Sequence, residues 1–214
     1  MALKIGVLGQ KGGAGKSTLS RLLAVEYARS EWNVLIADFD PLQSTSTKWN
    51  ERRLKNGHAP VVDVTPFNSI ERVLRIDDSY DLIIFDSAPH ATQKTMEIAG
   101  TVDLIVIPTG MTLDDLNPSI ALANDLKRHG VTRDKIVFVL NHVGSSSAEL
   151  SEAYETITDV GYICIGDLPE RTAYHRALDM GQSLTETPYE TLNQKAGALA
   201  EAIHDKMRVD TEAV

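Results

Sequence analysis

A glycine-rich segment at residues 9–18 has the residue types needed to bind a polyphosphate. It lies between the largely apolar run 5–8 and a helical pattern that starts near Ser17. A strand that ends in such a turn and restarts as a helix directs several backbone N–H groups at one point, where the helix dipole also favours negative charge. The glycines permit close approach of the backbone, Lys16 can reach the outer phosphates, and the Ser17 hydroxyl can ligate Mg²⁺. The segment therefore predicts nucleotide binding by Lys11, Gly12, Gly13, Ala14, Gly15, Lys16, Ser17 and Thr18, the last of which begins the helix.

Carboxylates follow two later apolar runs. Asp38 and Asp40 leave the run 34–37, and Asp86 leaves the run 82–85. Two aspartates before a proline can simply cap a turn, and many strands end in aspartate, so neither pattern is specific alone. Together with a phosphate loop they favour a functional interpretation, in which a buried strand of the Walker B form holds Asp86 where it binds Mg²⁺, commonly through a metal-bound water.

Strand and helix patterns alternate along most of the chain and would position these groups. Further apolar runs at 61–64, 104–108, 136–140 and 162–165 predict strands, the first at a sheet edge. Helical spacing predicts helices near 17–30, 44–54, 70–74, 92–99, 112–128, 148–158 and 192–207. This alternation predicts an α/β fold, a single-domain P-loop NTPase whose mainly parallel twisted sheet has helices on both faces. The aspartates then share the carboxyl edge of the sheet, where open α/β sheets bind ligands.

Length and composition fit one domain. We expect an ATPase domain over residues 1–208 and a short polar tail over 209–214 of the 214-residue chain. The formal net charge of −9 argues against a surface coated by nucleic acid, although a local basic patch is compatible with it. Because only three residues precede the first strand and no apolar run approaches the roughly 20 residues of a membrane span, we expect a cytoplasmic protein. The one cysteine, Cys164, predicts a small buried hydrophobe and no disulfide framework.

The phosphate segment departs from the common pattern G-x-x-x-x-G-K-[ST], because Gln10 stands five positions before Gly15. It resembles instead the deviant Walker A motif K-G-G-x-G-K-[ST] of the ParA/MinD family, with Lys11 as its first lysine. That resemblance implies an ATP-bound sandwich dimer in which Lys11 reaches the phosphates held by the partner subunit. Gly12 would lie at the seam between the subunits, with no side chain to obstruct it.

The segment 38–43 resembles the A′ motif D-x-D-P-Q of the same family. The resemblance implies that Asp38 lies near the metal and that Asp40 positions or activates the attacking water. One departure is that Leu42 follows the proline and Gln43 comes next. Either Gln43 takes the glutamine's role from one position on, or that role is vacant.

Three residues near the later strands match family contacts to the nucleoside. Asn141 corresponds by position to an asparagine that contacts the adenine base, and Pro169 and Glu170 lie where a proline-containing loop faces adenine and ribose. Pro169 and Glu170 are candidates for backbone contacts. Asp114 and Asp115 also match a family passage, and we interpret them first as charges at a helix start and second as dimer contacts.

The resemblance covers nearly the whole chain and is closest to short ParA-type ATPases without an N-terminal DNA-binding module, which partition plasmids or position cellular cargo. It implies Mg²⁺-dependent ATP hydrolysis by Lys11, Lys16 and Asp40, with Ser17, Asp38 and Asp86 at the metal. It also implies a homodimer when ATP is bound, nonspecific DNA binding at the nucleoid, and an adaptor that stimulates hydrolysis, ParB-like or specific to a cargo. Residues that could form the DNA-binding patch are Arg171, Arg176, Lys195, Lys206 and Arg208.

Three other functions compete. A MinD-like membrane switch needs a basic, strongly amphipathic C-terminal helix, and residues 202–208 followed by acids are a poor candidate. A dethiobiotin-synthetase-like enzyme would need an acceptor pocket and would turn over without a protein partner. The third alternative is that the protein binds the nucleotide without hydrolysing it, which would follow if Asp40 does not activate water. Iron-protein relatives of nitrogenase are set aside, because a single cysteine provides no paired cluster ligands.

Overall fold

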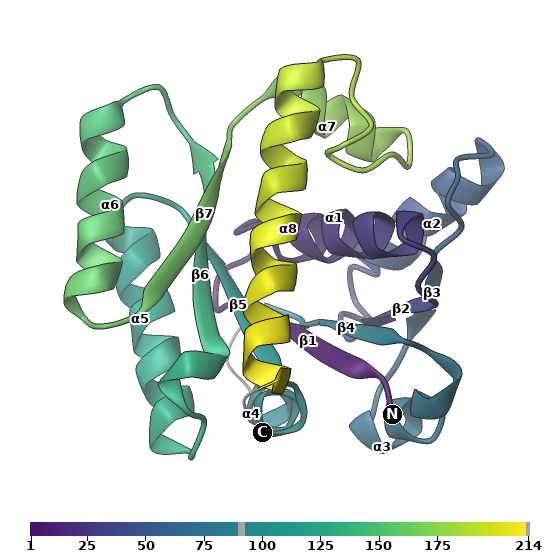
Figure 1. The fold of residues 1–214 in the computed structure, drawn as a ribbon, viewed down its shortest axis with the longest axis horizontal. Helices are drawn as coiled ribbons and strands as arrows, with labels where there is room; N and C mark the ends of the chain where they lie inside the picture. Colours follow the sequence, from purple (N-terminus) through teal and green to yellow (C-terminus); the bar gives the residue numbers. More distant parts are fainter. Residues whose placement is uncertain (90–92, 213–214) are drawn as a thin grey trace.

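One parallel sheet organises the computed structural model, which describes residues 1–89 and 93–212 (Figure 1). Its strands are β1 (Leu3–Val7), β2 (Val34–Asp38), β3 (Asp63–Pro66), β4 (Leu82–Asp86), β5 (Leu104–Thr109), β6 (Ile136–Val143) and β7 (Ile163–Pro169). The order across the sheet is β3-β2-β4-β1-β5-β6-β7, and each neighbouring pair is parallel. The predicted α/β class and parallel sheet are confirmed.

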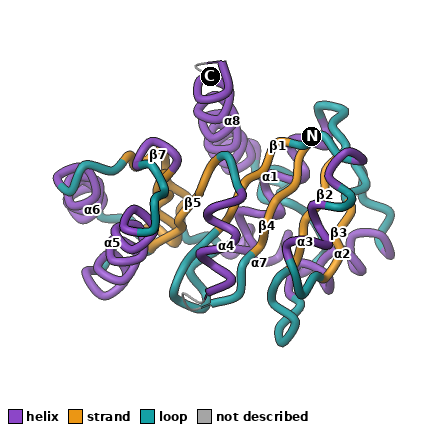
Figure 2. The backbone as a smooth tube through the Cα atoms, turned by 90° about the horizontal axis from the view of Figure 1, so that it is seen from below, coloured by secondary structure: helices purple, strands orange, loops and turns teal. Residues whose placement is uncertain are grey.

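Helices cover both faces of the sheet. They are α1 (Lys16–Arg29), α2 (Thr45–Lys55), α3 (Ile70–Leu74), α4 (Gln93–Thr101), α5 (Leu113–Arg128), α6 (Ser147–Asp159), α7 (Thr172–Asp179) and α8 (Glu190–Glu212), with short 3₁₀ turns at Asp77–Ser79 and Arg133–Lys135. Alternate residues of each strand enter opposite cores. Val34 and Ile36 pack with α1, α2, α7 and α8, whereas Leu35 and Ala37 pack with α3 to α6. Figure 2 shows the strands, in orange, enclosed between the helices. This two-sided burial explains why the strands are nearly continuous apolar runs.

Several element boundaries differ from the sequence expectation. Strands β6 and β7 continue to Val143 and Pro169, past the predicted ends, because Val143 and Leu168 are buried and extend the cores. Helix α8 includes residues 209–212, for which the sequence predicts a polar tail. The short strand β3 lies at the sheet edge as predicted, although it begins at Asp63. The predicted start of α4 at Thr92 falls outside the described residues.

Cys164 is half-buried, and burial raises the pKa of its thiol to about 11.

A buried ion pair fastens α2 to the segment between α7 and α8. The guanidinium of Arg53, which is fully buried, donates to both carboxylate oxygens of Glu186 at 2.7 and 3.1 Å. The Ser183 N–H also donates to Glu186. Burial opposes ionisation of Glu186, but the hydrogen bonds from Arg53 and Ser183 outweigh it and lower the pKa of its carboxyl. The pair therefore holds together elements far apart in sequence.

We predict that Glu186→Gln destabilises the protein by about 3 kcal/mol at pH 7, because it leaves the Arg53 charge buried without its counter-charge. Since the pKa of Glu186 is lowered on folding, its contribution is complete above the usual value of 4.5 and is lost as the pH falls through the lower folded value. The free energy of unfolding in urea should thus differ between wild type and variant at pH 7, and the difference should shrink below pH 4.5. Glu51→Gln, on the exposed face of α2, is the control. A difference that is small, or that stays constant with pH, would contradict this role.

Candidate nucleotide-binding site

The phosphate loop joins the end of β1 to the start of α1 at the carboxyl edge of the sheet. Gly13 and Gly15 have φ angles of 77° and 104°, which lie in the region that glycine tolerates best. Gly15 precedes the first residue of α1, and within residues 1–89 and 93–212 no side chain caps this helix start. Its backbone N–H groups are therefore available to an anion, and the helix dipole reinforces that preference.

Two side chains hold the loop from within the protein. The Asn141 amide donates to the carbonyl of Ala14 at 3.0 Å, and the Lys16 ammonium donates to the carbonyl of Lys11 at 2.9 Å. Asn141 also lies so close to Gly15 that a Cβ there would meet its amide nitrogen at 1.9 Å. Burial lowers the pKa of Lys16, while Asp86 and Asp40 oppose that shift. The loop is thus preorganised around its own lysine.

Asp38 organises the turn after β2. One of its carboxylate oxygens accepts the Asp40 N–H at 3.0 Å, and the other accepts the backbone N–H and the hydroxyl of Thr47 at 3.1 and 2.9 Å. Asp40 in turn accepts the Gln43 N–H. Asp38 therefore positions Asp40 and the start of α2, and its predicted place near the metal stays a prediction.

Asp86 has a carboxylate oxygen that the protein leaves unused. Its Oδ2 accepts the Ser46 hydroxyl at 2.7 Å, whereas among the described residues its buried Oδ1 has no hydrogen-bond partner. Burial and the neighbouring Asp38 raise the pKa of Asp86 to about 6, against the opposing influence of Ser46, Ser17 and Arg21. A buried carboxylate oxygen without a donor costs free energy unless a cation or its water shell meets it. Asp86 and the nearby Ser17 hydroxyl therefore fit a hydrated Mg²⁺.

A cavity of about 190 Å³ opens beside the loop. Lys16, Ser17 and Asp40 line it, which brings the predicted phosphate and water-activating groups to one space. Gln43 lines it as well, so the displaced glutamine reaches the site.

Sequence reasoning missed three residues that support this cavity. Arg21 is buried on α1, its guanidinium lies over the Trp49 ring, and burial lowers its pKa to about 10. Ser46 and Thr47 hold Asp86 and Asp38 respectively. The run of hydroxyl residues at 44–47, directly after the aspartate turn, was the available signal.

Lys11 lies at the rim of the loop instead of inside the cavity. Its ammonium pairs with Asp115 at the start of α5, 2.8 Å away, and 43% of its side chain is exposed. Asp115 also accepts the Thr112 hydroxyl. Burial opposes ionisation of Asp115, but these hydrogen bonds outweigh it and lower its pKa. Gly12 beside it faces open space, since a Cβ there would have no described atom within 4 Å.

The three residues expected near the adenine base lie in different surroundings. Asn141 lies against the phosphate loop, whereas Pro169 ends β7 and the Glu170 N–H donates to the Val143 carbonyl. The Glu170 side chain contacts His142 and His175. His142 therefore lies between the Glu170 carboxylate and the phosphate loop, since its Nε2 is 3.1 Å from the Gly13 carbonyl.

The basic residues expected to meet on one surface fall into two groups. Arg171 and Arg176 belong to the exposed surface at α7, which Figure 1 shows beside the first turns of α8. Lys195 is in those turns, and its ammonium pairs with Asp167 at 2.8 Å. Lys206 and Arg208 lie about 16 to 20 Å farther along α8, because a helix rises 1.5 Å per residue. A single compact patch cannot include both groups.

A search of the helices in the described part of the chain found none with the length and apolar character required to cross a membrane.

The loop, the orphaned carboxylate oxygen and the parallel sheet define a nucleotide-binding domain of the P-loop type. Residues 5–184 match the family described as the CobQ/CobB/MinD/ParA nucleotide binding domain. The chain belongs to this family.

Individual relatives are distant. Protein ParA of Rhizobium radiobacter is 24% identical over 205 residues, covering 93% of this chain and 90% of that protein. An ATPase ASNA1 homolog of Plasmodium berghei is 22% identical over 223 residues, covering 84% of this chain, and the match spans 58% of that longer protein.

Solved structures share the fold across almost the whole chain. The septum site-determining protein MinD of Pyrococcus horikoshii, complexed with Mg-ADP, has a TM-score of 0.76 at 18% identity and covers 98% of this chain and 99% of its own. Apo McdA of Cyanothece has a TM-score of 0.76 at 19% identity, with coverages of 95% and 100%.

We predict that Gly15→Ala lowers both stability and nucleotide affinity. The new Cβ would displace the Asn141 amide from Ala14 and would strain a backbone held at a φ of 104°. We expect a loss of about 1–3 kcal/mol in urea unfolding and little binding of a fluorescent ATP analogue. Gly12→Ala is the matched control, because its Cβ meets open space. Equal behaviour of the two variants would show that the Asn141 contact does not support the loop.

Proposed function

We propose that this protein is a ParA-type ATPase that alternates between a monomer and an ATP-bound sandwich dimer. The observation that carries the proposal is the division between the two lysines of the loop. Lys16 is buried beside the phosphate cavity, whereas Lys11 is half-exposed at the rim and held by Asp115. Lys16 would therefore bind the chain's own nucleotide. Lys11 would leave Asp115 and bind the nucleotide of another subunit.

We assign one or more residues of this site to each step of hydrolysis. The N–H groups of the loop and the Lys16 ammonium would bind the β- and γ-phosphates, while Ser17 and Asp86 would hold a hydrated Mg²⁺. The metal supplies charge neutralisation at the phosphates when bound. Asp40, fixed by Asp38 and lining the same cavity, would orient the attacking water.

Dimerisation would complete the site. Lys11 would leave Asp115 and bind the γ-phosphate held by the partner subunit. Its ion pair with a carboxylate would thus be replaced by an ion pair with a phosphate, which carries more charge. The open space around Gly12 allows the second copy to approach the loop closely. Turnover would then depend on dimerisation.

We further propose that the dimer binds DNA without sequence preference and that an adaptor protein stimulates hydrolysis. Arg171 and Arg176 at α7 are the better-placed basic residues, since Lys195 is already paired with Asp167. The similarity to ParA of Rhizobium radiobacter over nearly the full length supports this role. Plasmid partition and cargo positioning share this ATPase, so the proposal includes both.

Asp40→Ala should trap the dimer. Without its water-orienting carboxylate, the protein should bind ATP and Mg²⁺ but hydrolyse ATP about 10²- to 10⁴-fold more slowly. Light scattering with ATP and Mg²⁺ should then report twice the monomer mass. Lys16→Ala, which removes the phosphate-binding ammonium, should stay monomeric in the same buffer. If Asp40→Ala also remains monomeric, the sandwich mechanism is wrong.

Gly12→Val should separate nucleotide binding from dimerisation. The backbone at Gly12 does not need glycine, and a Cβ there meets open space within the chain, so we expect the fold and ATP affinity to be preserved. A branched side chain at the seam should block the second copy. Size exclusion of the Asp40→Ala/Gly12→Val double variant with ATP and Mg²⁺ measures this. Gly100→Val, at another open glycine, is the control, and a dimer that persists in both double variants would place the interface elsewhere.

DNA retention by the ATP-bound Asp40→Ala dimer tests the role in the cell. We expect binding that falls with salt, and Arg176→Ala should reduce the salt slope by about 0.9 for each phosphate contact removed. Lys135→Ala, an exposed cation in another part of the chain, should leave the slope unchanged. Sedimentation with anionic liposomes is the parallel assay. Retention on liposomes without retention on DNA would favour a MinD-like membrane switch.

A further inference from the structure

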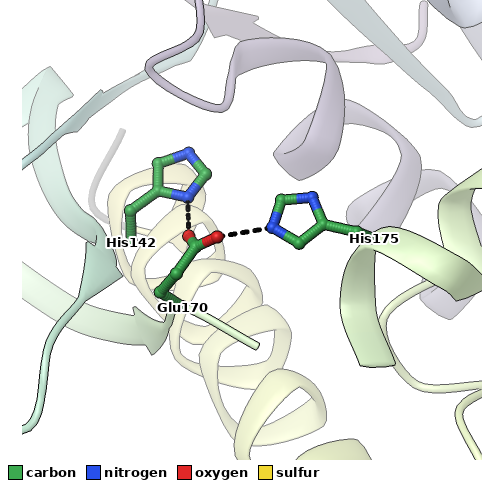
Figure 3. A group of neighbouring side chains, drawn as sticks. All are labelled: His142, Glu170 and His175. Carbon is green, nitrogen blue, oxygen red and sulfur yellow. Dashed lines mark hydrogen bonds and ion pairs between the residues drawn. The ribbon is translucent and has the colours of Figure 1, made fainter. Parts of the chain in front are cut away.

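Two histidines and a glutamate converge (Figure 3) at the edge of the phosphate cavity, which His142 also lines. His142 comes from the end of β6, Glu170 from the residue after β7, and His175 from α7. The two carboxylate oxygens face different rings: Oε1 lies 2.5 Å from His175 Nε2, and Oε2 contacts His142 Nδ1. The possible ligand atoms of the three residues all lie within 4.8 Å of one another.

The hydrogen bonds of His142 determine which nitrogen carries its proton. Its Nε2 lies 3.1 Å from the Gly13 carbonyl, which can only accept, so Nε2 must be the donating N–H. In the neutral ring Nδ1 then has a lone pair, and this lone pair faces a carboxylate oxygen of Glu170. Two acceptors in contact repel each other, so this contact requires a proton on Nδ1 or, after the side chains move apart, a metal ion in the place of that proton. A backbone carbonyl that fixes the remote N–H is also the arrangement that orients histidines bound to metals.

The backbone holds the three side chains toward one another. His142 has a φ of 56°, a left-handed conformation that is costly for residues other than glycine and that aims its ring at Glu170. The Glu170 N–H donates to the Val143 carbonyl, which fixes the residue next to the end of β6. The rings of His142 and His175 are nearly parallel, with an interplanar angle of 8° and centroids 6.3 Å apart. They flank the carboxylate from two sides.

We propose that His142, Glu170 and His175 bind a divalent transition-metal ion of the zinc type. Imidazole nitrogen and carboxylate oxygen are favoured ligands of Zn²⁺, with bonds of about 2.0–2.2 Å. Three protein ligands leave one coordination position open, and all three side chains are exposed, so solvent or a second ligand can occupy that position. If changes in the side-chain torsion angles moved the three ligand atoms by about 1 Å, their spacing would be that of a tetrahedral site.

The metal would act as a clamp. It would tie the end of β6 to α7, and it would fix the imidazole that contacts the Gly13 carbonyl of the phosphate loop. This site is separate from the proposed Mg²⁺ position at Ser17 and Asp86. It does not depend on ATP hydrolysis, so its failure and the failure of the proposed function are distinguishable.

Cobalt titration tests the proposal. The full chain, treated with chelator and free of nucleotide, is titrated with Co²⁺ and monitored by visible absorption, and Zn²⁺ is then added as competitor. We expect one Co²⁺ per chain with the intense d–d bands of a low-coordinate site, which Zn²⁺ abolishes. At a Zn²⁺ concentration of about 100 Kd the Tm should also rise by about 5–10 °C.

Matched variants identify the ligands. His175→Ala and Glu170→Gln should each weaken Co²⁺ affinity at least about tenfold and abolish the Tm shift. His129→Ala removes an exposed imidazole from the end of α5 and should bind like wild type. Far-UV circular dichroism checks that each variant is folded. The proposal is overturned if wild type shows no saturable binding, or if His175→Ala, Glu170→Gln and His129→Ala all bind with wild-type affinity, which would leave a proton as the cation between His142 and Glu170.

Discussion

The contact between the Asn141 amide and the phosphate loop is the constraint on which the rest of the site depends. It fastens the loop to β6, 127 residues away in the sequence, and it leaves Gly15 no space for a side chain. With the loop fixed at the carboxyl edge of the sheet, the helix start of α1, Asp38 and Asp86 are placed relative to it by the parallel register of β1, β2 and β4. An anion meets N–H groups that are already oriented, so little ordering entropy opposes binding.

The two buried aspartates have different tasks. Asp38 and Asp86 are partners in the register of β2 and β4, yet Asp38 uses both oxygens within the protein, whereas Asp86 keeps one without a described partner. A satisfied carboxylate stabilises the turn that carries Asp40. An unsatisfied one, with a pKa raised to about 6 by burial, is ready for a cation. The chemistry of the site therefore follows from which hydrogen bonds are made and which one is left open.

The sequence was sufficient for the fold and for bringing the phosphate loop and the aspartates to one edge of the sheet. Apolar runs marked buried parallel strands, and the glycine–lysine segment marked the phosphate loop, because both depend on local residue types. Contacts between distant segments could not be read in this way. The pairing of Lys11 with Asp115 joins residues 104 positions apart, and the placement of Asn141 under the loop depends on β6 continuing beyond its apolar run. Likewise, no sequence pattern separates Lys206 and Arg208 from Arg171, since that separation follows from the straight path of α8.

The position of Lys11 tests the central claim most directly. A crystal structure of the Asp40→Ala protein with ATP and Mg²⁺ would show where its ammonium goes. We expect Lys11 to have left Asp115 and to lie about 3 Å from a γ-phosphate oxygen of the nucleotide bound by a second copy. A structure in which Lys11 remains on Asp115, or points into solvent away from any phosphate, would contradict the account.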